Sequence, residues 1–239
     1  MFARLFASRR PAETDLAYAY RKAYDLVAGE MTMREHSSNI GLLTADPFPR
    51  DGRLISDAWL ILTDYSFGFY MPDRVASQPA FAQVFDAWGE AVGTITDPGL
   101  YIIAHGKQAT DASGTPQLAA GVVNVPTAVA HLVFQVATSP SIDRMEAAHA
   151  IQAEARLERV SAFTPFNELF SDITTHIQLP SQRPQDLSAS DYFALASAIA
   201  AMNPTKDLRV RKALLMSNSQ SPGALEEAKE QALKIMGIH

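Results

Sequence analysis

The stretch Asp57-Ala-Trp-Leu-Ile-Leu-Thr-Asp-Tyr-Ser-Phe-Gly-Phe-Tyr-Met71 decides the fold class. Its two halves are rich in aromatic and β-branched residues, a composition typical of strands. Tyr65 and Ser66 separate the halves and predict a tight turn. We therefore expect an antiparallel hairpin over residues 57–72.

Further strand candidates lie on both sides of this stretch, at 40–44, 91–95, 100–104, 117–125 and 128–138. Residues 96–99, Thr-Asp-Pro-Gly, predict the turn of a second hairpin. The spacing of Phe81, Val84, Phe85 and Trp88 fits either a strand or a helix. Seven or eight short strands at intervals of roughly ten residues favour a small sandwich or barrel.

Segments with helical periodicity flank this β region on both sides. Residues 12–29 predict a helix with Thr14 as its cap and Gly29 as its stop. Residues 140–160 predict a long helix that closes the β unit, with Ser139 as its cap. Between residues 189 and 239, Asn203-Pro204 and Ser221-Pro222 each predict a helix start with proline in the first turn. Gly237 is the predicted stop of the last helix.

These elements predict an α+β protein: a small antiparallel β-barrel or sandwich closed by a long helix, with an N-terminal helix and a helical C-terminal subdomain. The predicted segments are a basic arm and helix at 1–32, the β domain with its closing helix at 33–160, a connector at 161–188 and the helical subdomain at 189–239.

Residues 33–160 resemble a bacterial pleckstrin-homology-like domain. The residues that carry the resemblance are Trp59–Tyr70 and the strand-to-helix segment Leu132–Val160. The resemblance implies a bent barrel plugged by its C-terminal helix, used as a scaffold for protein or membrane-surface contact. Lipid-binding members of this family carry several cations in the loop between their first two strands. This chain offers only Arg50 and Arg53 there, beside Asp46 and Asp51, so the resemblance gives weak support to phosphoinositide binding.

Composition narrows the range of functions. The 239 residues include 20 basic and 26 acidic side chains, a net charge of −6, and no cysteine. The lack of cysteine excludes disulfides, zinc–thiolate sites, iron–sulfur clusters and a cysteine nucleophile. Five basic and two acidic residues fall within positions 1–22, so a basic arm with Arg4, Arg9 and Arg10 precedes an acidic body. The acidic body argues against nucleic acid as a partner.

No targeting segment is predicted. Arg4 and Arg9 interrupt the apolar residues at the N-terminus, which excludes a secretory signal of the usual form. The most apolar stretch, 122–137, is shorter than the roughly 20 residues that a membrane span needs. We expect a cytoplasmic protein, with peripheral attachment to a membrane as an alternative.

Motifs for catalysis and metal binding are incomplete. Glu146 and His149 have the Glu-x-x-His spacing of a metal-binding helix, but the second copy of that motif is absent. The chain has no phosphate-binding loop, nucleophile elbow or dinucleotide fingerprint. We therefore expect no metal and no cofactor, and we assign no catalytic residue.

Three functions remain open. The first is a non-enzymatic adaptor whose helical C-terminal subdomain binds a protein partner. The second is a peripheral membrane protein that uses Arg4, Arg9, Arg10, Arg50 and Arg53 on an anionic surface. The third is an enzyme whose site assembles from residues distant in sequence. A homo-oligomer stays open under each of them.

Overall fold

The computed structural model describes residues 12–35, 40–63, 65–73, 78–106, 119–139, 141–162 and 183–238. The chain divides into two compact units. The β unit comprises Gly29–Leu179 with Ala201–Pro204. The helical unit comprises Met1–Ala28, Pro180–Ala200 and Thr205–His239. The predicted α+β class is confirmed in this general form.

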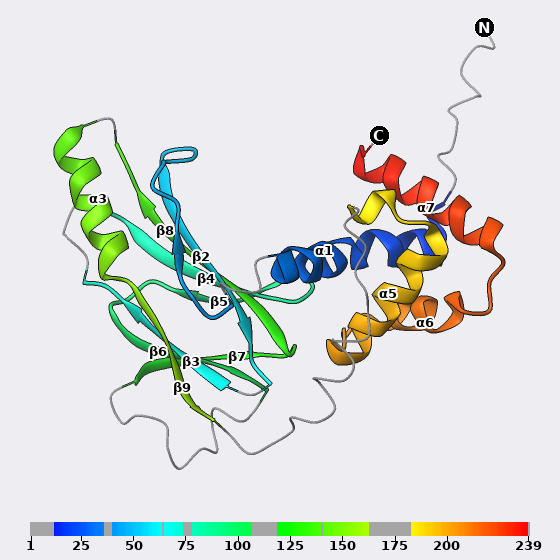
Figure 1. Cartoon of the computed structure of the whole chain (residues 1–239), viewed down its shortest axis with the longest axis horizontal. Helices are drawn as coiled ribbons and strands as arrows, with labels where there is room; N and C mark the ends of the chain where they lie inside the picture. The colour runs from blue at the N-terminus through cyan, green and yellow to red at the C-terminus, as the bar shows by residue number, and fades with distance from the viewer. Residues whose placement is uncertain are drawn as a thin grey trace, which may run out of the picture. The chain divides into compact units, whose positions relative to one another are not determined.

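Two sheets form the β unit (Figure 1). Sheet A has the strand order β1-β2-β8-β4-β5 and sheet B has the order β7-β6-β3-β9. Every pairing is antiparallel except that of β6 with β7. In chain order the strands are β1 (Thr44–Ala45), β2 (Arg53–Ile61), β3 (Tyr65–Met71), β4 (Ala80–Asp86), β5 (Ala91–Ile95), β6 (Gly99–His105), β7 (Ala119–Val125), β8 (Val129–Ala137) and β9 (Arg156–Ala162).

The predicted hairpin over residues 57–72 is wrong. Both strands exist, but β2 belongs to sheet A and β3 belongs to sheet B. Leu60 and Phe67 are both buried, one from each sheet, and they belong to the same core cluster. The short connection therefore crosses between layers instead of turning back within one. The predicted second hairpin fails in the same way, because β5 lies in sheet A and β6 lies in sheet B.

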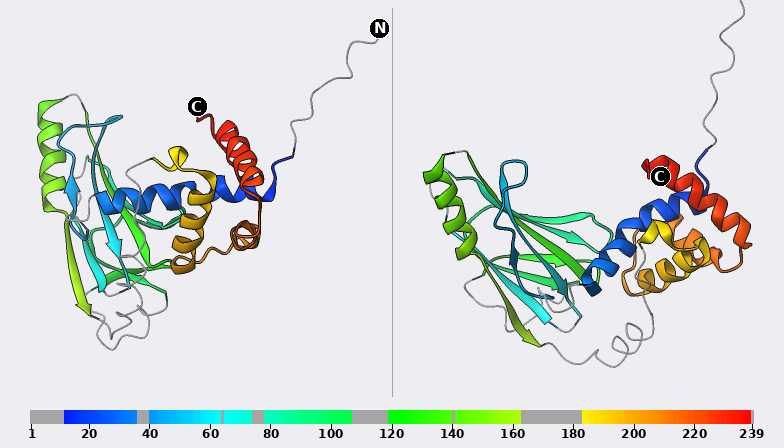
Figure 2. Two further views of the ribbon diagram at one scale, coloured as in Figure 1. Left: turned by 45° about the vertical axis from the view of Figure 1, so that its right-hand side comes forward. Right: turned by 45° about the horizontal axis from the view of Figure 1, so that its top comes forward.

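The core lies between the two sheets, which are not closed into a barrel. Phe69 of β3 packs against Phe134 of β8, with ring centroids 5.8 Å apart. Helix α3 (Ile142–Glu154) contributes Ala148 and Ile151 to this core. The views in Figures 1 and 2 place α3 along one end of the sheets. A helix at the end of the sandwich was predicted, but its predicted length was wrong, because the chain leaves the helix at Ala155 and continues as β9.

The helical unit is built from segments near both ends of the described chain. Its elements are residues 15–28 of α1 (Asp15–Glu35), a 3-10 turn (Pro184–Asp186), most of α5 (Ala189–Met202), α6 (Leu208–Ser217) and α7 (Pro222–Met236). Tyr20 of α1 stacks on Tyr192 of α5, with ring centroids 3.8 Å apart. The chain therefore divides differently from the predicted segments, which separated residues 1–32 from residues 189–239. Of the predicted connector, residues 163–182 lie outside the described part of the chain.

Several predicted helix ends are confirmed and others are wrong. The Thr14 hydroxyl accepts a hydrogen bond from the backbone N–H of Ala17, and the Ser221 hydroxyl accepts one from Ala224. Gly237 ends α7 with a φ of 71°, a left-handed conformation that glycine adopts at little cost. Gly29 does not end α1, which continues to Glu35. Helix α6 begins after Asp207, not after the predicted cap Asn203.

Asn203 is instead buried in the β unit, where it forms hydrogen bonds with two other segments. Its side-chain Oδ1 accepts a hydrogen bond from the backbone N–H of Val129, and its backbone oxygen accepts one from Trp88 Nε1 at 2.8 Å. Trp88 follows the last residues of β4, where Asp86 accepts hydrogen bonds from the backbone N–H groups of Trp88 and Glu90. This network fixes the residues that follow β4 against the start of β8.

We predict that Asn203→Ala lowers the free energy of unfolding by about 1–3 kcal/mol, because the N–H of Val129 would stay buried without its acceptor. Denaturant unfolding followed by tryptophan fluorescence measures the change. Asn124→Ala, at an exposed position of β7, is the matched control and should change stability by less than about 0.5 kcal/mol. Equal effects of the two substitutions would contradict the role assigned to Asn203.

Candidate functional site: exposed interaction surfaces

The predicted pair Arg50 and Arg53 lies on the hairpin formed by β1 and β2. Their backbones bridge each other, with N–H···O distances of 2.8 and 3.0 Å. Arg50 forms an ion pair with Asp46 at 2.8 Å. Arg53 donates to Gln135 Oε1 at 2.7 Å and lies over the ring of Phe81. Each guanidinium therefore has a partner within the β unit, which weakens the expectation that the two converge on a phosphate.

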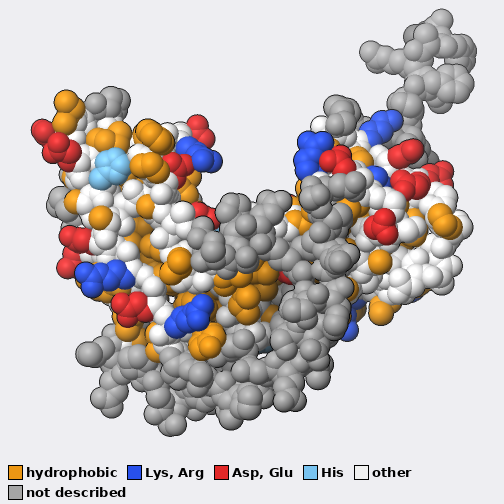
Figure 3. Space-filling view, in the orientation of Figure 1, with side chains coloured by type: hydrophobic (Ala, Val, Ile, Leu, Met, Phe, Trp, Pro, Cys, Tyr) orange, Lys and Arg blue, Asp and Glu red, His pale blue; other side chains and the backbone are white. Residues whose placement is uncertain are grey.

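The other predicted binding residues, Arg4, Arg9 and Arg10, lie outside the described residues. Among the helices of the described part, none is long and apolar enough to cross a membrane. On the face drawn in Figure 3, basic side chains are scattered over both units and form no continuous patch.

An acid–histidine pair that the sequence did not reveal lies on the outer face of sheet A. His131 Nε2 is 2.9 Å from Asp57 Oδ2, and the His131 ring stacks on Trp59 at a centroid distance of 4.4 Å. The pair forms because β2 and β8 are in register, with Trp59 opposite His131. Asp57 and Trp59 therefore hold the imidazole ring in place. No serine or threonine hydroxyl of the described residues forms a hydrogen bond with His131, so the pair lacks the nucleophile of a catalytic triad.

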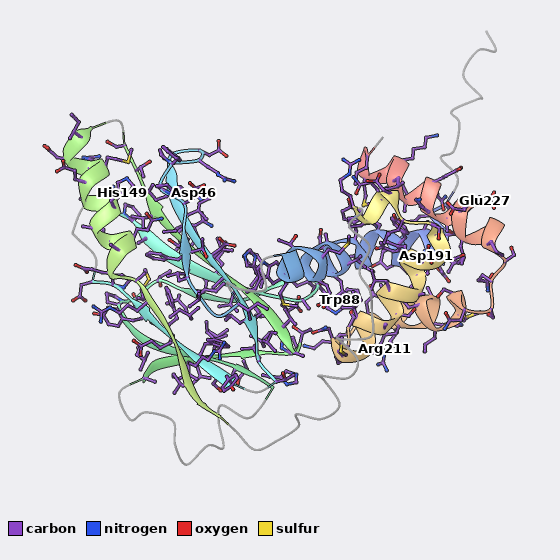
Figure 4. All side chains as sticks on the ribbon, viewed as in Figure 1. Asp46, Trp88, His149, Asp191, Arg211 and Glu227 are labelled. Atoms are coloured by element: carbon purple, nitrogen blue, oxygen red, sulfur yellow. The ribbon has the colours of Figure 1, made fainter. Side chains whose placement is uncertain are left out.

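Glu146 and His149 lie on α3, where Glu146 is exposed and His149 is half-buried. Figure 4 shows His149 and Asp46 at the same end of the β unit. The contact made there is structural: Gln152 donates to the backbone oxygens of Asp46 and Ile55. No group of three or more histidine and acidic side chains within the described residues could hold a metal ion.

A polar cluster in the helical unit fixes the start of α6 against α1. Asp207 caps α6 by accepting hydrogen bonds from the backbone N–H groups of Arg209 and Val210 at 2.9 and 3.1 Å. The Tyr18 hydroxyl donates to Asp207 at 2.8 Å. Arg209 stacks 4.2 Å from the centre of the Tyr18 ring and pairs with Asp15 at 2.7 Å. These bonds determine which side of α6 faces inward.

The same cluster shifts the acidity of its members. Partial burial raises the pKa of the Asp207 carboxyl, but the hydrogen bonds from Tyr18 and from the α6 backbone outweigh burial and hold that pKa below its usual value. The pKa of Tyr18 is raised, chiefly because its hydroxyl is bonded to the Asp207 carboxylate. Asp207 is therefore a charged cap at neutral pH.

The outward side of α6 carries large apolar side chains between cations. We call Leu208, Arg211, Lys212, Leu215 and Met216 the α6 face. Leu208 is 72% exposed and Leu215 is 78% exposed, which marks them among the most exposed large apolar side chains of the described residues. Arg211, labelled in Figure 4, and Lys212 are exposed on the same helix. The inward residues Val210, Ala213 and Leu214 are buried.

The α6 face has a simple signal in the sequence, since Leu208, Arg211, Lys212 and Leu215 follow the i, i+3, i+4, i+7 spacing of one helix face. The two cations in this pattern favour an exposed face, because lysine and arginine are rarely buried. The structure shows that the other side, with Val210, Ala213 and Leu214, is the buried one.

Comparison with known proteins defines only the fold. No protein-family model and no curated protein matches the chain. A similar solved structure is that of the VPA0106 protein from Vibrio parahaemolyticus, which is 14% identical with a TM-score of 0.60. The match covers 94% of this chain and 58% of that one, so the chain spans less than two thirds of the length of that protein. At this identity the likeness supports the α+β fold and carries no function.

The Asp207 cap gives a prediction with a defined pH dependence. At pH 7, Asp207→Ala should lower the free energy of unfolding by about 1 kcal/mol, the usual value of a lost N-cap. Because the folded pKa lies below the unfolded value near 3.9, this stabilisation is present above about pH 4 and is lost as the pH falls further.

Denaturant unfolding at pH 7 and at pH 3 tests this prediction. The difference between the wild-type protein and Asp207→Ala should narrow at pH 3. The exposed Asp73, replaced by alanine, serves as the control. A difference that stays constant or widens in acid would contradict the assignment of Asp207 as a charged cap.

Proposed function

We propose that this protein is a non-enzymatic adaptor that binds a protein partner through its helical unit. The observation that carries the proposal is the α6 face, where Leu208 and Leu215 are largely exposed although Val210, Ala213 and Leu214 of the same helix are buried. Exposed apolar side chains surrounded by polar groups are typical of interaction sites. On this proposal the β unit is the pleckstrin-homology-like scaffold predicted from the sequence.

The construction of the helical unit supports the same function. Hydrogen bonds and an ion pair hold α6 in place at both ends. Asp207 and Arg209 attach its first turn to α1, and Ser197 of α5 donates a hydrogen bond to the backbone oxygen of Leu214. A rigid helix face loses little conformational entropy when a partner binds. The exposed leucines therefore contribute to association without a prior ordering step.

Photo-crosslinking in the cells that make the protein tests the adaptor function. A photoreactive amino acid at position 215 should give a discrete adduct with another protein, and that protein, once purified, should bind the full chain. The same amino acid at position 42, where the native leucine is 56% exposed on the β unit, is the matched control.

The adaptor function would be contradicted if no adduct formed at position 215 and none formed at other exposed apolar positions, such as 48, 142 and 235. An adduct at one of these other positions alone would retain the adaptor function and move the contact away from α6. A deletion of residues 189–239 is a poor substitute for this experiment, because it would uncover the buried side of α1 around Tyr20.

A second candidate function is binding to an anionic membrane surface, and Phe48 favours it. This side chain is 75% exposed on the β1–β2 hairpin, between Pro47 and Pro49 and close in sequence to the exposed Arg50. Aromatic and cationic side chains together are typical of membrane-surface segments. Salt-sensitive flotation with anionic vesicles that is lost in Phe48→Ala would favour this function over the adaptor.

A further inference from the structure

The arrangement of charge around the two leucines indicates what the α6 face binds. Helical residues follow one another at about 100°, so Leu208 and Leu215 lie within about 20° of each other and about 10 Å apart along the axis. On the same scale Arg211 lies about 60° to one side of Leu208 and Lys212 about 40° to the other. The face is therefore a narrow apolar row with a cation on each flank.

Among the described residues, these two cations have no ion-pair partner. Within the described residues neither Arg211 nor Lys212 forms an ion pair, and α6 itself contains no acidic residue. Arg209 differs from both, because it is bound to Asp15 of α1 and to the backbone oxygen of Glu13, which precedes that helix. The chain as a whole has a net charge of −6, so a helix with three basic residues and no acidic one differs from the composition of the protein.

We propose that the α6 face docks an acidic amphipathic helix of a partner protein. The inference rests on the proposed adaptor function and names the chemistry of its partner. Leu208 and Leu215 are one heptad apart, so a partner helix with an apolar row at heptad spacing can pack against both. Glutamate or aspartate residues beside that row would pair with Arg211 and Lys212, as flanking charges do between paired helices.

The narrow width of the apolar row favours a partner helix, and not a membrane surface, as the ligand of the α6 face. A helix that lies in a membrane interface buries a broad apolar face and keeps its cations on the opposite, polar side. On α6 the cations lie within about 60° of the leucine row, and the buried residues Val210, Ala213 and Leu214 lie on the opposite side of the helix. The strip between the cations is about as wide as one partner helix.

The test uses the full chain and two synthetic peptides of three heptads. Both peptides carry leucine at the a and d positions; one carries glutamate and the other lysine at the e and g positions. Fluorescence anisotropy with labelled peptide at low concentration should show that the wild-type protein binds the glutamate peptide at least tenfold more tightly. Arg211→Glu with Lys212→Glu should reverse this preference, and Leu208→Ala with Leu215→Ala should weaken binding at least tenfold.

A matched control comes from α7, where Lys234 and Ile235 are also exposed. Lys234→Glu with Ile235→Ala should leave both affinities within twofold of wild type. Thermal unfolding of each variant confirms that the fold is retained, as expected for substitutions at exposed positions.

Equal binding of the two peptides, binding that the α6 substitutions leave unchanged, or no binding of either peptide would overturn the inference. Flotation with phosphatidylcholine–phosphatidylglycerol vesicles that depends on Leu208 and Leu215 would assign the face to a membrane and overturn it as well. A purified crosslinked partner that binds the α6 variants as tightly as wild type would preserve the adaptor function and refute only this contact.

Discussion

The helical unit depends on the stacking of Tyr20 on Tyr192. Both side chains are completely buried, and the Tyr192 hydroxyl donates to the backbone oxygen of Tyr20 at 2.8 Å. Burial raises the pKa of both hydroxyls, so the two rings stay neutral and bonded over the physiological range. In sequence the two tyrosines lie on opposite sides of all nine described strands. The stack therefore closes a loop of the chain that contains all nine described strands, and it holds α1 and α5 together.

Local signals in the sequence predicted the elements better than their pairing. Thr14, Ser221 and Gly237 act within a few residues of themselves, so their roles could be read from the sequence. The predicted hairpin between β2 and β3 was wrong, because alternating burial gives the orientation of a strand but not the sheet to which it belongs. The sequence does not mark β9 clearly, because Arg156–Ala162 follows a helix directly and Glu158 and Arg159 break the alternation of polar and apolar residues that is typical of a strand.

The candidate surfaces also combine local features, which the sequence shows, with long-range contacts, which it does not. The exposure of Phe48 follows from a turn-rich stretch that the sequence marks clearly, and the spacing of Leu208 and Leu215 identifies one face of a helix. The apolar residues Val210, Ala213 and Leu214 indicate the buried side of α6. The sequence could not show the contacts with Tyr18 and Asp15, almost 200 residues away, that attach this helix to α1. The pair of Asp57 and His131 could not be predicted either, because it needs the register of β2 against β8.

Hydrogen exchange of the full chain, compared between wild type and Tyr192→Ala, tests most directly whether the two ends of the chain form one cooperative unit. The amides of residues 15–28, α5, α6 and α7 should lose protection together in the variant, while those of β2, β3 and β8 keep theirs. Unchanged protection in α6 and α7, or an equal loss in the strands, would contradict a helical unit built on the contact between Tyr20 and Tyr192.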